Sequence, residues 1–284
     1  MIKKSIYLCS ICTLLFLSGC ASSNYVKVPP ELILYDQTHT QPIDIKELIS
    51  KVDAANTEID SFKANLKFTF SDFRKKSSLP FVCNGKIAIE KPYNLRLVGY
   101  SMIGGSLFDL SSNGDEFYLY LPKEAKILKG SSTLSEELST PVIRLRPNHV
   151  MESFFMQDLK YYYDKYLCFY EYYPETYVLY FVDKHESKPY LVKKIWVNDK
   201  TFDIVRHQTF KPNGLLTLDV KMIEFYSFDE KGYFPKKMKI LRPNSSLDVT
   251  MEFSKIKIEP KLSEKTFILN IPDGIEIYNL DMDE

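Results

Sequence analysis

The sequence predicts a mainly β (α+β) fold built on antiparallel strands with a few helices. Apolar and polar residues alternate through much of the chain after residue 80, a period of two that is typical of strands with one buried face. Short turns such as Lys91-Pro92 and Ser112-Asn113-Gly114-Asp115 separate these segments. Strands joined by such short turns pair antiparallel, because a parallel connection needs a dozen or more residues. The 20 Tyr and 19 Phe against 10 Gly also favour strands over disorder.

Residues 1–19 have the pattern of a bacterial lipoprotein signal peptide. Lys3 and Lys4 precede an apolar run that ends at Leu17, and the small residues Ser18 and Gly19 stand directly before Cys20. The run is shorter than the ~20 residues that a membrane-spanning helix needs. We therefore expect cleavage before Cys20 and lipidation of that residue, which would anchor the chain to a membrane.

The residue after the lipidated cysteine bears on localisation. In enterobacteria-like systems an Asp at this place retains a lipoprotein in the inner membrane, and this chain has Ala21 instead. We expect the periplasmic face of the outer membrane. The 37 Lys and Arg residues balance the 37 Asp and Glu residues. Because the chain has no excess of basic residues, we expect no nucleic-acid partner.

The period of the apolar residues divides the rest of the chain. Residues 20–42 contain several Ser and Pro and no sustained period, which predicts a lipidated tether, and residues 43–284 are expected to form one folded domain. Apolar residues at three- and four-residue steps predict a helix over 43–60 and another over 147–158, and Thr133 with Glu136 predicts a short helix between them. Strands are predicted at 81–90, around 95–97, and at 117–121, 167–173, 177–182, 190–197, 203–210, 216–228, 234–241 and 247–258. In the last strand the apolar positions expected to face inward shift by one residue, which predicts a β-bulge near Ser254.

Two features leave alternatives open. Cys83 and Cys168 could form a disulfide in an oxidising periplasm, or they could be two separate buried thiols. The tyrosine-dense stretch from Tyr161 to Tyr180 could be an aromatic binding surface, or it could reflect β-propensity and packing at a sheet edge.

No motif for covalent chemistry is evident. The four histidines, His39, His149, His185 and His207, fall in different predicted elements, and no metal-ligand spacing or catalytic serine motif is present. We therefore expect no enzymatic activity, no metal and no cofactor. A periplasmic hydrolase remains an alternative, which would require a polar cleft where a His and a carboxylate converge.

Several segments resemble the LolA/LolB family of lipoprotein-sorting proteins. Residues 84–89 followed by 92–97 look like the family's strand, turn and next strand, and similar likenesses occur at 145–148, 198–214 and 267–274. The resemblance implies an incomplete, strongly curved β-barrel whose helices close an apolar cavity. In this family LolA is a soluble periplasmic carrier, whereas LolB is an outer-membrane lipoprotein that receives and inserts cargo. Cys20 places this chain on the LolB side.

The segment 101–107 is similar to the LolB loop in which a protruding leucine promotes insertion of cargo into the membrane. Met102 takes the place of that loop's proline, and Ile103 takes the place of the leucine. Judged without the family, these two residues either form an apolar tip that enters a membrane or grips an acyl chain, or fold back onto the core.

The resemblance predicts an outer-membrane-anchored lipoprotein that binds acyl chains or other lipoproteins in its half-barrel and assists their insertion, with a periplasmic carrier protein as a partner. The alternative is a structural lipoprotein that uses the same fold as a scaffold in the cell envelope. The candidate cavity lining consists of inward-facing residues of the first strands, which a packed core would use equally: Ile87, Ile89, Leu95, Leu97, Leu119 and Leu121.

Overall fold

The computed structural model describes residues 43–56, 59–72, 79–132, 146–156, 158–184, 188–228 and 233–281, and residues 43–284 form one compact unit. The predicted signal peptide, the lipidated Cys20, the tether and the short helix at Thr133 lie outside the described residues.

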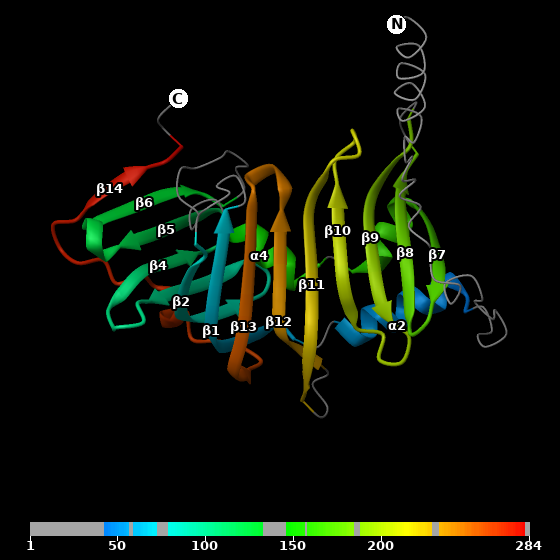
Figure 1. Ribbon diagram of the computed structural model, residues 1–284, viewed down its shortest axis with the longest axis horizontal. Coiled ribbons are helices and arrows are strands. Elements are labelled where there is room, and N and C mark those ends of the chain that lie inside the picture. Colours follow the sequence, from blue (N-terminus) through cyan, green and yellow to red (C-terminus); the bar gives the residue numbers. More distant parts are fainter. Residues whose placement is uncertain are drawn as a thin grey trace, which may run out of the picture. The chain divides into compact units, whose positions relative to one another are not determined.

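The described strands form a single 14-stranded sheet, curved and open, with the order β14-β6-β5-β4-β3-β2-β1-β13-β12-β11-β10-β9-β8-β7 (Figure 1). Neighbours pair antiparallel except β14 and β6, which are parallel. The predicted mainly β class and the incomplete barrel are confirmed. The strands are β1 (Ser61–Asp72), β2 (Phe81–Glu90), β3 (Asn94–Tyr100), β4 (Ser106–Ser112), β5 (Glu116–Leu121), β6 (Lys126–Ser131), β7 (Leu167–Tyr173), β8 (Thr176–Asp183), β9 (Tyr190–Asn198), β10 (Ile204–Phe210), β11 (Leu216–Ser227), β12 (Tyr233–Arg242), β13 (Leu247–Ile258) and β14 (Glu276–Asn279).

Strand β1 was not among the predicted strands. Its alternate residues Phe62, Leu66 and Phe68 are buried, while Lys67 between them is exposed. The alternation was present in the sequence, but Phe62 also fitted the three- and four-residue spacing of the preceding helix. β1 lies between β2 and β13 and therefore joins the two halves of the sheet.

The bulge predicted near Ser254 is confirmed. Asn65 of β1 pairs with Ser254 of β13, but Lys63, two residues earlier, pairs with Lys257, three residues later. One residue of β13 is thus extra, and Lys255 has a φ of +50°, in the left-handed region. The bulge ends the alternation of fully buried residues on β13.

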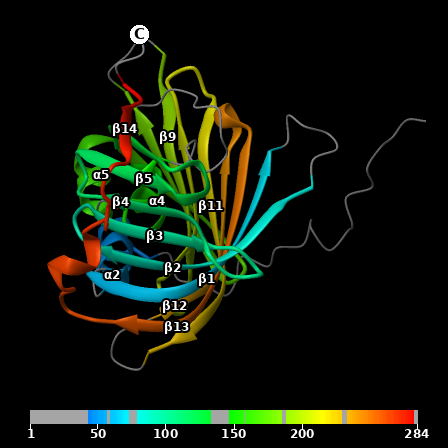
Figure 2. The same cartoon turned by 90° about the vertical axis from the view of Figure 1, so that its left-hand side faces the viewer.

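Three α-helices of the described residues lie on the same side of the sheet (Figures 1 and 2): α2 (Ile45–Asn56), α4 (Pro147–Phe154) and α5 (Leu159–Lys165). α2 begins after Asp44, whose Oδ1 accepts the backbone N–H groups of Lys46 (2.9 Å) and Glu47 (3.3 Å). Both predicted helices are shorter than expected at their C-terminal ends. α5 was not predicted, because its tyrosines favoured strand by propensity.

The helices divide the interior into two core clusters. The first joins α4 to the first five strands and to β11–β13, and the second joins α2 and α5 to strands β8–β10. Val150 and Met151 of α4 belong to the first cluster, and Leu159 of α5 belongs to the second. Phe155 packs against the first cluster and Met156 against the second, so these two residues lie at the seam between the clusters.

Candidate functional site

A cavity of about 600 Å³ lies at this seam, between α4, α5 and strands β9–β11. Small-molecule sites typically have volumes of about 300–1,000 Å³. Met151 and Leu218 on its wall come from the first core cluster, whereas Met156 and Tyr162 pack against the second. The lining residues are Lys91, Pro92, Tyr93, Asn148, Met151, Glu152, Phe155, Met156, Asp158, Tyr162, Val192, Lys193, Thr209 and Leu218.

The sheet side of the cavity is a row of residues across three strands. Lys193 of β9 pairs with Thr209 of β10, and Thr209 pairs with Leu218 of β11. Neighbouring strands are about 4.8 Å apart, so the row presents an ammonium, a hydroxyl and an aliphatic side chain in succession. The opposite wall is α4, with Met151 and Glu152.

Lys193 is the buried charge of this cavity. Its Nζ lies 3.7 Å from the Sδ of Met156 and 5.2 Å from the centre of the Tyr162 ring. Burial lowers the pKa of Lys193 to about 8, and Glu152 opposes this shift. Burial also raises the pKa of Glu152, while Lys193 and Arg242 act to lower it. The cavity thus combines apolar walls with the buried ammonium of Lys193, whose charge Glu152 partly compensates.

Beside this row lies a fully buried histidine, His207 of β10. Burial, followed by the charge of Lys193, lowers the pKa of His207 to about 3, so the imidazole is neutral at neutral pH. His207 lines a neighbouring cavity of about 70 Å³ together with Asp53 and Phe155. A third cavity, of about 80 Å³, lies between the end of α2 and strands β11 and β12.

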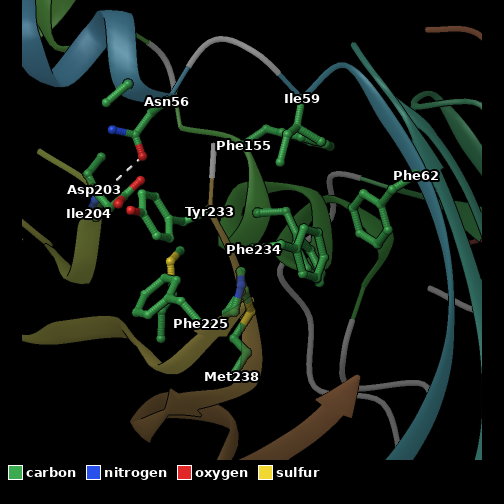
Figure 3. Close-up of a pocket in the computed structure, with 14 residues that line it drawn as sticks. Asn56, Ile59, Phe62, Phe155, Asp203, Ile204, Phe225, Tyr233, Phe234 and Met238 are labelled. Atoms are coloured by element: carbon green, nitrogen blue, oxygen red, sulfur yellow. Dashed lines mark hydrogen bonds between the residues drawn. The ribbon is translucent and has the colours of Figure 1, made fainter. Parts of the chain in front are cut away.

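Phe155 borders all three cavities. It is the first residue after α4, and its ring lies beneath Lys91, whose Nζ is 5.1 Å from the ring centre. Figure 3 shows the third cavity, with Phe155 and Ile59 above Phe234 and the Asn56 side chain bonded to the backbone N–H of Ile204 at 3.4 Å. Phe155 is therefore the one lining residue that the three cavities have in common.

The candidate lining residues do not line the large cavity. Ile87, Ile89, Leu95, Leu97 and Leu119 are buried in the first core cluster, Leu121 packs against it, and none of the six borders the large cavity. The physical reason is that α4 docks on this half of the sheet and joins its core. The signals that could have pointed to the cavity are the Phe154-Phe155-Met156 run and a lysine, Lys193, on the inward parity of β9.

The tip between β3 and β4 is exposed. Met102 and Ile103 are 79% and 98% exposed, so they do not fold back onto the core. The turn continues through Gly104 and Gly105, which have φ values of +99° and +84°. Leu79, 91% exposed, precedes the paired strand β2 at the same end of the sheet. This end of the sheet thus carries several exposed apolar side chains.

Cys83 and Cys168 are free cysteines. Cys83 belongs to the first core cluster and Cys168 packs against the second, so the disulfide that we considered is not formed. Burial raises the pKa of Cys83 to about 11 and that of Cys168 to about 12. Both thiols are therefore protonated at neutral pH.

The tyrosine-dense stretch spans α5, the edge strand β7 and part of β8. Tyr162 packs in the second core cluster, while Tyr172 and Tyr173 are exposed. The hydroxyls of the exposed pair are bound to carboxylates of the same chain, Asp199 (2.8 Å) and Glu171 (3.0 Å). The tyrosines of this stretch thus make packing contacts and hydrogen bonds within the chain at the edge of the sheet. Among the described residues, no group of three or more His, Cys, Asp or Glu could hold a metal ion, and no helix is long and apolar enough to cross a membrane.

These features define a half-barrel protein with helices on its concave face and a cavity between them. The fold is similar to that of a LolA superfamily protein from Nitrosomonas europaea, whose crystal structure matches with a TM-score of 0.52 at 14% identity, over 80% of this chain and 99% of that one. A DUF1329 family protein from Desulfovibrio piger matches with a TM-score of 0.53 at 14% identity, over 78% and 95%. A Vibrio parahaemolyticus domain named for outer membrane lipoprotein sorting matches with a TM-score of 0.53 at 11% identity, over 78% and 94%. No family model and no curated protein sequence matches this chain. The fold that the resemblance to the LolA/LolB family implied is confirmed.

Proposed function

We propose that this chain is an outer-membrane-anchored lipoprotein that binds acyl chains of lipids or lipoproteins and assists their insertion into the membrane. The observation that carries the proposal is the cavity of about 600 Å³ at the seam between the two core clusters. Binding and release there need no covalent chemistry, and a periplasmic carrier protein would supply the cargo.

The chemistry of the cavity suits an acyl chain with a polar end. Met151, Met156 and Leu218 offer an apolar and adaptable wall, because methionine side chains are unbranched and flexible. Removing apolar surface from water stabilises the complex by roughly 25 cal/mol per Å². Lys193 would receive an ester, carboxylate or phosphate oxygen at the head of the chain.

The exposed tip supports the insertion step. A protein attached through Cys20 remains at the membrane surface. The apolar Ile103 side chain would then enter the bilayer near the place where the cargo is inserted. The Lol-type half-barrel fold is consistent with this arrangement.

Filling the cavity tests the binding step. Thr209→Trp places an indole in the cavity. The matched control is Thr250→Trp, the same change on β13 at a position facing away from the helices. Each full-length protein is purified from membranes in detergent, and its bound lipids are measured by mass spectrometry. We expect acyl lipids on the native protein and the control and at least tenfold less on Thr209→Trp. Equal lipid on all three, or none on the native protein, would contradict binding in this cavity and favour the scaffold role.

Charging the tip tests the insertion step. Ile103→Glu should lower the transfer of a fluorescent lipoprotein from carrier to liposomes several-fold, since a carboxylate resists entry into lipid. Leu215→Glu, at an exposed turn between β10 and β11, is the control. If Ile103→Glu transfers cargo as fast as this control, the tip has no part in insertion.

A further inference from the structure

A groove of about 520 Å³ lies on the sheet face opposite the helices, bounded by β1, β2, β3, the bulge of β13 and residues 265–270. Arg96 and Lys265 line it from β3 and the C-terminal segment, and its floor includes Ala88 and Val98. No carboxylate is among the described residues that line it. Its cationic lining residues are Lys63, Lys86, Arg96, Lys255, Lys257 and Lys265.

The strand register brings these lysines together. Lys63 of β1 lies directly opposite Lys257 of β13. Lys86 of β2 pairs with Asn65, which in turn pairs with Ser254 beside the bulge. Like charges directly opposite one another destabilise a sheet, so this arrangement has a cost to folding.

The bulge adds a further lysine to the same place. With unbroken alternation, Lys255 and Lys257 would continue on the face of the buried Met251 and Phe253. The extra residue of β13 instead lets both lysines line the groove on the other face. Lys255 adopts a left-handed backbone conformation, with a φ of +50°, that non-glycine residues rarely adopt.

Little negative charge compensates this groove. Among the described residues, no ion pair is made by Lys86, Lys255, Lys257 or Lys265, and all four are exposed. Lys63 is 3.9 Å from Glu259, and Arg96 is held by Asp109 at 2.6 Å. The whole chain has equal numbers of basic and acidic residues, so this is a local concentration of positive charge on a neutral protein.

We propose that this groove is an anion-binding site that takes a phosphate-bearing group. Lysine ammonium groups bind phosphate as point charges, and a groove lined by one sign of charge focuses the field on a ligand within it. A bound phosphate would compensate the facing lysines, and the apolar floor would contact the carbon skeleton that carries it. The site lies on the opposite face from the acyl cavity and does not depend on it.

The test measures binding of inorganic pyrophosphate to the full-length protein in nonionic detergent by isothermal titration calorimetry. Lys255→Glu with Lys257→Glu reverses two groove charges, and Lys123→Glu with Lys211→Glu makes the same change at exposed lysines elsewhere. We expect the groove variant to bind at least about tenfold more weakly and the control to bind as the native protein does. The affinity should also fall as salt is raised.

A second arm distinguishes the sources of phosphate. Micelles doped with phosphatidylglycerol or phosphatidylcholine replace pyrophosphate in the titration. Binding of phosphatidylglycerol micelles that pyrophosphate competes away identifies a lipid headgroup, and binding of pyrophosphate alone identifies a soluble phosphate compound. The proposal is overturned if neither probe binds, or if the groove variant and the control lose affinity equally. Loss of acyl lipid on Thr209→Trp leaves this result unaffected.

Discussion

Asp53 of α2 accepts the backbone N–H group of Leu159, the first residue of α5, at 2.6 Å. It also accepts the N–H of Lys160 at 3.0 Å, while Asp158, the residue before the helix, makes no side-chain cap. A residue from another helix thus performs the role of an N-cap. This contact fixes α5, and with it Tyr162, at the wall of the large cavity.

Replacing this cap should destabilise the protein. We expect Asp53→Ala to lower the free energy of unfolding by about 1–2 kcal/mol, because two backbone donors lose their acceptor. Urea unfolding followed by circular dichroism measures the change. Asp53→Asn, which keeps an acceptor oxygen, is the control and should lose less. Equal losses for both variants would mean that the charge, and not the hydrogen bonds, matters.

Lys193 should reduce stability at neutral pH. Its pKa is about 8 in the folded state against an ordinary 10.5, so below pH 8 the folded protein carries a buried ammonium at its full cost. Between pH 8 and 10.5 the folded state releases this proton first, and stability rises with pH. Lys193→Met should therefore be more stable at pH 7, by at most about 3 kcal/mol, and the difference should vanish near pH 10.5.

Urea unfolding of the native protein and Lys193→Met at pH 7 and pH 10 measures this difference. Because Glu152 loses its neighbouring ammonium, Lys193→Met with Glu152→Gln separates the two effects. A Lys193→Met protein that is less stable than the native one at pH 7, with or without Glu152→Gln, would contradict the expected sign.

His207 should make the protein sensitive to acid. The folded pKa is about 3 and the ordinary value is 6.5, so below pH 6.5 the unfolded chain binds a proton that the folded state does not. Stability from this group is complete above pH 6.5 and falls by about 1.4 kcal/mol per pH unit as the pH drops toward 3. His207→Leu should lose less stability between pH 6.5 and 4.5 than the native protein does.

Chemical denaturation at several pH values compares the two slopes. His149, whose pKa burial also lowers to about 3, keeps part of the acid sensitivity in the variant. The two proteins would have parallel profiles if His207 were protonated equally in the folded and unfolded states.

Phe155 should limit the length of the bound chain. Phe155→Ala removes the one side chain that lines all three cavities and should enlarge the space between them. We expect a shift toward longer acyl chains in the lipids that copurify, with a loss of about 2 kcal/mol in stability, less than for a fully buried phenylalanine. Phe228→Ala, at a ring outside these cavities, is the control. An unchanged chain-length distribution would show that Phe155 does not divide the site.

Much of the second half of the sheet could be predicted from local patterns. Strands at 167–173, 190–198 and 247–258 agree with expectation, since alternation and turn residues act over a few neighbours. β1 and α5 could not be assigned in this way, because Phe62 fits two periods and tyrosine-rich segments favour strands unless a helix packs them into a core. The exposed tip at Ile103 was located by sequence, but its exposure was not.

The sequence by itself determined the β class, most of the strands and the bulge near Ser254, and it predicts a signal that would mark Cys20 for lipidation. Only the tertiary structure decided where the inner face of the sheet is covered by a packed core and where it borders a cavity. Ile87 and Leu97 alternate with polar residues, as inward-facing residues do, whereas Val192 and Lys193 do not. The large cavity nevertheless lies beside Val192 and Lys193. An inward-facing side chain has the same sequence pattern whether a helix or an empty space faces it, and the docking of α4 and α5 makes that difference.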